Sequence, residues 1–381
     1  MTKVLHLYAG NLYGGIETFL STLARCRHFC PAMEPSFGLC FRGRIWNELG
    51  ESGVAVHDMG PVRWSRPWTV LRARKRLKSI LQNHHFDAVA THANWPHAVF
   101  APVVRRLRVP LANFVHDALR TMTWIDRLAA TTKPDLVIAN SHYSAKFVPG
   151  VFFDAPTKMF YIPVDSERTV SDPEHRRTLR RQLKTSEDAT VIIQVSRMES
   201  WKGAHRTISA LGLLKDCGHD WTAWIVGGAQ RPEEVIYENH LKDLVRQFDI
   251  EDRVRFLGQR NDVPRLLSAA DIFCQPNTSP EPFGIVFIEA LSAGVPVVTT
   301  NMGGGAEIVN DHCGRMVTSS DIETLVQAIS SLFAAENRPN PEVCMRRAIE
   351  LCDAKSQLTE YHHALTEMVA KLPKARRSIK C

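Results

Sequence analysis

The stretch Glu281-Pro282-Phe283-Gly284-Ile285-Val286-Phe287-Ile288-Glu289 decides how this chain is interpreted. A Pro-Phe-Gly turn follows the first carboxylate, an apolar helix ended by Gly294 carries the second, and a buried strand is expected at 295–300. A helix start binds phosphate through its unpaired N–H groups and its dipole, and a carboxylate accepts hydrogen bonds from hydroxyls. The stretch therefore fits a ligand that is both a polyol and an anion. A loop acid and a solvated helix acid would give the same pattern.

The bulk properties of the chain favour a globular protein of two domains. Its 381 residues exceed one typical domain, and 44% hydrophobic with 23% charged residues is ordinary for a folded protein. No run approaches the ~18 apolar residues of a membrane span, and residues 1–8 lead straight into a strand rather than a signal peptide. We therefore expect a cytoplasmic protein, with a peripheral position on the inner face of the membrane left open.

The nine cysteines do not predict a metal site. Cys26 and Cys30 form a lone C-x3-C, and no second pair follows at the spacing of zinc ligands. Structural zinc requires four ligands, so reduced and mostly buried thiols are the expectation for a cytosolic chain.

Strand-like apolar runs alternate with helical periodicity along the whole chain, which is typical of parallel α/β units. The charge-dense stretch 165–188 interrupts this alternation and is interpreted as an interdomain connection with one short helix. Two successive series predict two Rossmann-like domains that face each other, with ligands at the carboxyl ends of the strands. Strands are expected at 3–8, 36–41, 54–58, 87–91, 111–115, 135–139, 158–162, 190–196, 222–227, 253–257, 271–275 and 295–300. Helices are expected at 15–26, 67–83, 96–107, 119–131, 203–216, 233–248, 262–269, 284–293 and 321–335.

Gly14 and Gly15 follow the first strand at a helix start, where bare backbone can approach a phosphate. The pair is not a G-x-G-x-x-G fingerprint, and no acid stands at the spacing of a dinucleotide ribose clamp. A tight turn between strand and helix explains the pair as well as a phosphate site does.

Two cations, Arg197 and Lys202, follow the first strand of the second series, beside Gly203. Lone surface cations are common, but this position at the ligand-binding edge of a sheet favours anion binding. A guanidinium can hold phosphate bidentately, and an ammonium adds a compact point charge.

His116 comes directly after the buried strand 111–115, and it either points into the site or is a structural histidine. His92 and His97 lie at another strand end; they could line an acceptor pocket, but a structural role is favoured for each. Gly258 and Arg260 end a further strand, where loops meet a nucleobase. An ordinary turn before an N-capped helix accounts for that loop equally well.

Taken in order, these residues resemble family 4 of the retaining glycosyltransferases. The resemblance covers nearly the whole chain, and the E-x7-E segment with its Pro-Phe-Gly insert is its specific part. Residues 162–165 depart from the family pattern, because they lack the Asn-Gly that usually precedes Val-Asp. The residues that carry the resemblance are Gly14-Gly15 with Glu17, His116, Arg197, Lys202-Gly203, 281–289 and the following 303–309.

The resemblance implies the α/β GT-B fold, in which two Rossmann-like domains face each other across a deep cleft. The N-terminal acceptor-binding domain would comprise 1–165 and the C-terminal nucleotide-sugar domain 166–355. A C-terminal helix and basic tail at 356–381 would pack back toward the N-terminal domain.

The resemblance also implies roles for single residues. Arg197 and Lys202 would neutralise the donor diphosphate, together with the N–H groups near Ile285 and Val286. Gly15, with Gly14, would approach the phosphates from the other domain.

The sugar and nucleoside have their own expected contacts. Glu281, with the backbone at Phe283 and Gly284, would contact hydroxyls of the donor sugar, and His116 would lie near the transferred sugar. Glu289 would take the ribose hydroxyls.

We expect retaining transfer of a hexosyl group from a UDP-sugar, with a GDP-sugar as the second choice, to an acceptor hydroxyl. No D-x-D motif is present, and cations with a helix start can stabilise the leaving diphosphate, so neither a metal nor another cofactor is expected. By resemblance, the acceptor attacks from the leaving group's own face and a phosphate oxygen takes the proton. The acceptor would be a glycan, a lipid-linked glycan or a small metabolite.

Other partners and other functions stay open at this point. The basic stretch Arg72 to Lys78, with Trp64 and Trp68 before it, either contacts an anionic membrane or forms a solvated helix face. No nucleic-acid recognition motif is present. The same fold would also permit a nucleotide-sugar epimerase, a phosphorylase or a non-catalytic sugar-nucleotide binding module.

Overall fold

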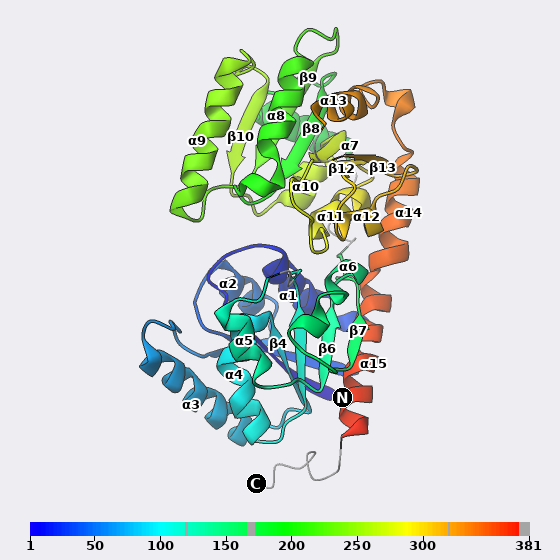
Figure 1. Ribbon diagram of the computed structural model, residues 1–381. Helices are drawn as coiled ribbons and strands as arrows, with labels where there is room; N and C mark the ends of the chain where they lie inside the picture. The colour runs from blue at the N-terminus through cyan, green and yellow to red at the C-terminus, as the bar shows by residue number, and fades with distance from the viewer. Residues whose placement is uncertain (119–120, 166–171, 319–320, 373–381) are drawn as a thin grey trace. The chain divides into compact units, whose positions relative to one another are not determined.

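The computed structural model divides into two units, each built on one parallel sheet (Figure 1). Unit 1 comprises Met1–Pro163 and Ala354–Cys381, and unit 2 comprises Val164–Asp353. The structure describes residues 1–118, 121–165, 172–318 and 321–372. The α/β GT-B architecture expected from the sequence is confirmed.

The sheet of unit 1 has seven parallel strands in the order β3-β2-β1-β4-β5-β6-β7. The strands β4 and β5 are buried along their whole length, and β1 is buried over Val4 to Leu7, because helices cover both faces of a parallel sheet. The strand order reverses between β1 and β4, so the crevice at their carboxyl ends is the ligand position of such a sheet. The bounds are β1 Thr2–Tyr8, β2 Met33–Leu39, β3 Ala55–Asp58, β4 Ala88–His92, β5 Leu111–Val115, β6 Leu136–Ala139 and β7 Thr157–Met159.

The helices predicted for unit 1 are found at their expected positions with one exception. The helix expected at 119–131 begins only at Trp124, because Thr123 and Asp126 form a capping box that starts it there. Residues 119–120 lie outside the described residues. The bounds are α1 Gly15–Arg25, α2 Arg44–Glu51, α3 Pro67–Asn83, α4 Asn94–Arg106, α5 Trp124–Ala130, α6 His142–Ala145 and α15 Ala354–Lys371. The short helices α2 and α6 were not predicted.

The C-terminal helix α15 belongs to unit 1 although it is the last element of the chain (Figure 1). Oγ1 of Thr2 lies 2.9 Å from Nε2 of His362, and Lys158 of β7 forms an ion pair with Glu367. Tyr361 is fully buried among aromatic rings of the sheet. The helix therefore closes one side of the core of unit 1. The tail at 373–381 lies outside the described residues.

The sheet of unit 2 has six parallel strands in the order β10-β9-β8-β11-β12-β13. Its strand order reverses between β8 and β11, which sets a second switch point. The strands are β8 Thr190–Val195, β9 Trp221–Val226, β10 Val254–Gly258, β11 Ile272–Gln275, β12 Val297–Thr300 and β13 Gly314–Val317. The helices are α7 Pro173–Gln182, α8 Ala204–Leu213, α9 Pro232–Gln247, α10 Val263–Ser268, α11 Ile285–Ser292, α12 Gly305–Ile308, α13 Ile322–Ser330 and α14 Pro341–Cys352. The elements β13, α12 and α14 were not predicted from the sequence.

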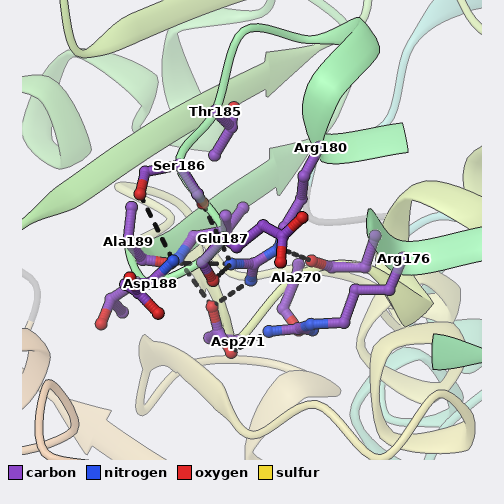
Figure 2. Close-up of polar contacts among 12 residues, drawn as sticks. Arg176, Arg180, Thr185, Ser186, Glu187, Asp188, Ala189, Ala270 and Asp271 are labelled. Atoms are coloured by element: carbon purple, nitrogen blue, oxygen red, sulfur yellow. Dashed lines mark hydrogen bonds and ion pairs between the residues drawn. The ribbon is translucent and has the colours of Figure 1, made fainter. Parts of the chain in front are cut away.

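The charge-dense stretch 165–188 contains the one short helix that was expected there, but this helix belongs to unit 2 and is not part of a connection between the units. Residues 173–182 form α7, which is anchored to unit 2 through Arg180 and Asp271 (Figure 2). Arg180 is 1% exposed, and its Nη2 lies 2.6 Å from Oδ2 of Asp271. Residues 166–171 lie outside the described residues.

Asp271 is the centre of this anchor. Arg176 and Arg338 also contact it, at 2.7 and 3.1 Å, and the N–H of Val191 donates to it at 2.8 Å. Burial alone would raise the pKa of Asp271, but Arg176 and Arg180 outweigh that effect and the pKa lies below its ordinary value. The carboxylate therefore stays charged and fixes α7 to the starts of β8 and β11.

The chain crosses the boundary of unit 2 twice, and the two crossing points are joined. The N–H of Val164 donates to the carbonyl of Cys352 at 3.0 Å, and Val164 forms a parallel bridge with Asp353. This pairing is made although 162–165 lacks the Asn-Gly usual in the family.

The cysteines and helices of the described residues carry two further findings. The eight described cysteines are unbridged, and seven of them are buried. Within the described ranges, no helix combines the length and apolar character needed to cross a bilayer.

Candidate active site

The loops after β8, β10 and β11 carry most of the site residues predicted in unit 2. The strands are parallel, so these loops emerge at the carboxyl edge of the sheet, beside the switch point between β8 and β11. The sequence pattern predicted this location for Arg197, Lys202, Glu281 and the start of α11.

The loop after β8 is pressed against the end of β11. Gly203, which starts α8, has a φ of +74°, and a Cβ there would lie 2.0 Å from the carbonyl oxygen of Pro276. Only glycine fits this position without displacing the neighbouring backbone. The N–H of Thr278 donates to the carbonyl of Trp201 at 2.8 Å and joins the two loops further.

Lys202 is held in place by several partners. Its Nζ donates to Oε2 of Glu281 at 2.6 Å and lies 4.1 Å from the centre of the Trp201 ring. The carbonyl of Lys202 accepts from Nε2 of Gln194 at 2.9 Å. The lysine predicted to meet phosphate and the acid predicted to meet sugar are therefore direct neighbours.

Arg197 is likewise paired, with Glu199, at 3.0 Å between Nη2 and Oε2. Its side chain is 30% exposed, so the guanidinium stays accessible from solvent. Glu199 was not predicted as a site residue. An acid two residues from a predicted phosphate-binding arginine is the signal that could have indicated it.

Glu281 is 8% exposed, and three donors converge on its Oε2. Besides Lys202, the side-chain amides of Gln275 and Asn277 donate to this atom, each at 3.3 Å. The N–H of Gly304 donates to the carbonyl of Glu281 at 2.7 Å, so the glycine-rich segment after β12 braces the loop. Gln275 and Asn277 were not predicted as site residues. Their position at the end of the buried strand β11, where polar side chains face the ligand-binding edge of the sheet, is the signal that could have indicated them.

The helix α11 begins directly after the Pro-Phe-Gly turn. Gly284 is its N-cap, with a φ of +99°. The N–H groups of Ile285 and Val286 in the first turn have no partner inside the helix, whereas the N–H of Phe287 donates to the carbonyl of Gly284 at 2.9 Å. Phe283 is buried beneath the turn. Glu289 lies one turn further along α11 and is partly exposed. The helix start therefore offers donors and a positive dipole end at the loop of Glu281.

The loop after β10 holds the remaining predicted residues of unit 2. The carbonyl of Gly258 accepts from the N–H of Gly227 at 2.8 Å, which fixes the strand end. Arg260 forms a bidentate pair with Asp262 at 2.8 and 2.7 Å. This hydrogen-bonded pairing raises the pKa of Arg260 and lowers that of Asp262. Asp262 is the N-cap residue of α10, but its side chain makes no capping hydrogen bond.

The other predicted residues lie in unit 1, at the start of α1 and just beyond the end of β5. The N–H of Gly14 donates to Oε2 of the buried Glu17 at 2.9 Å, so the N-cap position already has a carboxylate partner. Gly15 begins α1 and is exposed. Glu17 thus supports the turn rather than facing outward.

His116 lies just beyond β5 and is 6% exposed. Its ring stacks on Phe114 at 4.3 Å between centroids, and its Nε2 lies 3.2 Å from Nδ1 of His92. Burial lowers the pKa of His116 to about 3, so its ring is neutral near pH 7. His97 has a structural setting, because it bonds to Oγ1 of Thr91 at 2.8 Å and to the carbonyl of Thr132 at 2.7 Å.

The described residues contain no cluster of potential metal ligands. No group of three or more histidine, cysteine, aspartate or glutamate side chains among them is arranged to hold a metal ion. The donors around Glu281 are an ammonium and two amides, which suit a carboxylate and not a cation.

Family models match both units. The family described as "Glycosyl transferases group 1" matches residues 175–349, and the family described as "Glycosyltransferase Family 4" matches residues 32–168. The two ranges together include every strand of unit 2 and six of the seven strands of unit 1.

Named relatives and solved structures agree with these matches. A GDP-mannose-dependent monoacylated alpha-(1-6)-phosphatidylinositol monomannoside mannosyltransferase of Corynebacterium glutamicum is 27% identical over 84% of this chain and 85% of the relative. The lipopolysaccharide core biosynthesis mannosyltransferase LpsB of Rhizobium meliloti is 27% identical over 54% of this chain, and the match spans only 56% of that relative. The crystal structure of Anabaena Alr3699/HepE in complex with UDP-glucose has a TM-score of 0.84 and 26% identity, and covers 98% of this chain and 100% of that chain. The chain therefore belongs to glycosyltransferase family 4.

Proposed function

We propose that this glycosyltransferase moves a hexosyl group from a nucleoside diphosphate sugar to an acceptor hydroxyl, with retention of configuration and without a bridging metal ion. The contact between Lys202 and Glu281 at the start of α11, on the sheet edge that also carries Arg197, supports this proposal most directly. An ammonium, a guanidinium and a helix N-terminus all favour negative charge. A diphosphate leaving group gains such charge as the glycosidic bond breaks.

The diphosphate is assigned to the cations and to the first turn of α11. An ammonium has three N–H donors, and only one of them is needed for Glu281, so Lys202 can bind phosphate without giving up its partner. Arg197 adds a fork-shaped donor set, and the N–H groups of Ile285 and Val286 complete the site. Gly14 and Gly15 of unit 1 are assigned to the same phosphates through the family resemblance.

The donor sugar is assigned to Glu281. The three hydrogen bonds to its carboxylate all fall on Oε2, and among the described residues no donor reaches Oε1. Oε1 can therefore accept a sugar hydroxyl while Oε2 stays fixed by Lys202. The backbone at Phe283 and Gly284 lies in the same turn and contributes N–H groups.

The remaining assignments follow the family resemblance. Glu289 binds the ribose hydroxyls, and the loop of Gly258 and Arg260 meets the base. His116 acts beside the transferred sugar. The acceptor hydroxyl attacks from the face of the leaving group, and a phosphate oxygen takes its proton, so no carboxylate nucleophile is required.

Two donor nucleotides have support. UDP is favoured because the solved structure with 26% identity over nearly the whole chain is a complex with UDP-glucose. GDP is the second candidate, since relatives with 27% identity over 69 to 84% of this chain are named as GDP-mannose-dependent. The acceptor is a glycan, a lipid-linked glycan or a small metabolite.

A membrane contact through α3 is part of the proposal, but with a smaller set of residues than the sequence indicated. Nε of Arg74 donates to the carbonyl of Val99 at 2.7 Å, so this arginine joins α3 to α4 and is unavailable to lipid. Trp68 and Leu71 are 58 and 64% exposed, and Arg72 and Lys75 are exposed on the same face at helical spacing. This mixture of apolar and cationic side chains suits an anionic bilayer surface.

A ligand screen followed by product analysis tests the function. Thermal shifts are measured with UDP, GDP, ADP and dTDP and with their sugars, and a ligand at ~100 times its Kd adds about 2.7 kcal/mol. The preferred donor is then offered to an acceptor panel, and the anomeric configuration of the product is read by NMR. We expect a shift with UDP or GDP and a retained configuration.

Other outcomes of this screen would favour the rival functions. Conversion of the donor to its epimer without an acceptor would indicate an epimerase. A lysine-bound pyridoxal phosphate, visible by its absorbance, would indicate a phosphorylase. A donor that binds but is never consumed would indicate a binding module.

A further inference from the structure

Three histidines of unit 1 form one hydrogen-bonded series. Nδ1 of His6 lies 2.9 Å from Nε2 of His92, and Nδ1 of His92 lies 3.2 Å from Nε2 of His116. His6 and His92 are 0% exposed and His116 is 6% exposed, so the series reaches the surface only at His116. His6 lies in β1, His92 is the last residue of β4, and His116 directly follows β5. These three strands are neighbours in the sheet.

The strand register explains how distant residues meet. His6 lies opposite Ala90, and His92 is two residues further along β4, so both side chains lie on the same face of the sheet. His92 lies opposite Phe114, and His116 is again two residues further. The series therefore runs diagonally across the sheet toward the carboxyl edge, where the ligands of such sheets bind.

The three rings are neutral near pH 7. Burial lowers the pKa of His6 and of His116 to about 3 and lowers that of His92 well below its ordinary value. A neutral imidazole carries one proton, so one ring nitrogen donates and the other accepts. Both hydrogen bonds can then form in only two ways: all three protons on Nδ1, or all three on Nε2. The tautomer of His116 is thus linked to that of His6.

The buried end of the series favours protons on Nδ1. Among the described residues, Nε2 of His6 and Oη of Tyr361 have no hydrogen-bond partner, and the two ring centroids are 6.0 Å apart. Burial raises the pKa of Tyr361, so its phenol keeps its proton and requires an acceptor. With protons on Nε2, His6 and Tyr361 would each present a buried donor, and at least one would stay unsatisfied. With protons on Nδ1, His6 presents a bare acceptor nitrogen instead, so one buried donor fewer is left without an acceptor.

At the other end, this pattern places a proton on Nδ1 of His116. Within the described part of the chain, no hydrogen bond is made by that nitrogen. The ring plane is fixed by the stack on Phe114, and the backbone is fixed by Asn140, whose Nδ2 donates to the carbonyl of His116 at 3.1 Å. The side chain is therefore held as an oriented, neutral hydrogen-bond donor.

We propose that His6 and His92 are positioning residues that hold His116 as the Nδ1–H tautomer, so that Nδ1 donates to a hydroxyl oxygen of the transferred sugar. The identity of that ligand rests on the proposed function, whereas the tautomer itself does not.

The experiment measures the tautomers and the activity separately. The full chain is labelled with ¹⁵N-histidine, and two-bond ¹H–¹⁵N correlation spectra near pH 7.5 distinguish protonated from bare ring nitrogens. We expect Nδ1–H and bare Nε2 for all three histidines. Nε2–H at His116 in the wild type would overturn the proposal.

Two substitutions of His92 separate positioning from packing. His92→Phe keeps an aromatic ring but removes the donor, so His116 should shift toward Nε2–H and kcat should fall at least ~10-fold with unchanged nucleotide affinity. His92→Asn retains an amide donor near the position of Nδ1 and should restore the Nδ1–H form of His116 and part of kcat. Equal spectra and equal rates for the two variants would contradict the proposal.

The control is His97→Phe, which removes another fully buried histidine that has no contact with the series. It should leave the nitrogen pattern of His116 unchanged. If the wild type transfers no sugar from any donor, the proposed function fails, but the nitrogen spectra still decide whether the series sets the tautomer. If His92→Phe does not fold, His6→Phe tests the same linkage from the buried end.

Discussion

Nζ of Lys202 lies 2.6 Å from Oε2 of Glu281, although 79 residues separate the two in the chain. This contact joins the loop after β8 to the loop after β11 across the switch point of the sheet. Gln275 and Asn277 donate to the same carboxylate oxygen, so the orientation of Glu281 does not depend on Lys202 alone. A substitution of Lys202 should therefore remove a charge from the site without releasing the acid.

Glu289→Ala is expected to weaken binding of the nucleoside diphosphate, because it removes the proposed acceptor of the ribose hydroxyls. Hydrogen bonds to a charged group contribute about 1.5–3 kcal/mol, so the Kd should rise roughly 10- to 100-fold. Titration calorimetry with UDP and GDP measures the change. The control is Glu323→Ala, which removes an exposed acid from the first turn of α13 in the same unit. An unchanged Kd for Glu289→Ala would show that the ribose assignment is wrong.

The double substitution Arg72→Glu and Lys75→Glu is expected to reduce binding to vesicles that contain phosphatidylserine. Each cation near an anionic surface contributes about 1 kcal/mol, so the loss should be at least ~30-fold in sedimentation assays. Arg177→Glu with Arg181→Glu is a matched control, since these are two exposed arginines one helical turn apart on α7. If both double variants bind vesicles like the wild type, α3 does not contact the membrane.

The stability of the protein is expected to fall as the pH is lowered from 6.5 toward 4, in part through His97. Burial is the main cause that lowers the pKa of His97 from 6.5 to about 4. Between these values the unfolded chain binds a proton that the folded chain does not, so the free energy of unfolding decreases by about 1.4 kcal/mol per pH unit for this group. His97→Gln should therefore flatten the slope measured by urea unfolding between pH 5 and pH 7.5.

The control for this pH series is His28→Gln, which replaces an exposed histidine of the same unit. The wild type should lose about 2 kcal/mol more than His97→Gln between pH 6.5 and pH 5. The same slope in the wild type and in His97→Gln would mean that the pKa of His97 is not lowered in the folded state.

Asp271→Ala is expected to lower the free energy of unfolding of unit 2 by about 3–5 kcal/mol. The substitution leaves Arg180 buried without its counter-charge and removes the partner of Arg176 and Arg338. Denaturant unfolding measures the effect. Asp243→Ala, which removes an exposed acid paired with Arg246 on α9, should change stability by less than about 0.5 kcal/mol. A similar small effect at Asp271 would mean that the anchor of α7 contributes little.

Local pattern was sufficient to predict much of the fold. Buried parallel strands are short apolar runs, and their alternation with helices indicated two Rossmann-like units, while the family resemblance indicated GT-B. The pattern was insufficient where contacts between distant residues determine the local structure. The stretch containing α7 has few apolar residues, and its helix is fixed by Arg180 on Asp271, a residue 91 positions away. Charge density alone made this segment look like a linker.

In the candidate site, too, residues at strand ends could be predicted from the sequence, whereas contacts between loops could not. A cation or acid at the end of a strand could be assigned from sequence, because parallel strands end at one edge. The pairing of Lys202 with Glu281, and of Arg197 with Glu199, depends on how the loops fold onto each other. The histidine series was also missed, since it requires the register of three strands. His92 had been interpreted as an individual structural residue, yet it bonds to both His6 and His116.

In the proposed reaction, positive charge at the start of α11 stabilises the departing diphosphate. The single-turnover rate in EDTA, with the preferred donor and acceptor, tests it in the wild type and in Lys202→Met. One well-placed donor to developing charge contributes about 3 kcal/mol, so we expect a ~100-fold fall in this rate for Lys202→Met. Lys242→Met, which removes a lysine paired with Glu238 on α9, should react at the wild-type rate. A wild-type rate for Lys202→Met, or a wild type that is inactive in EDTA and recovers with Mg²⁺, would mean that the leaving diphosphate is stabilised in another way.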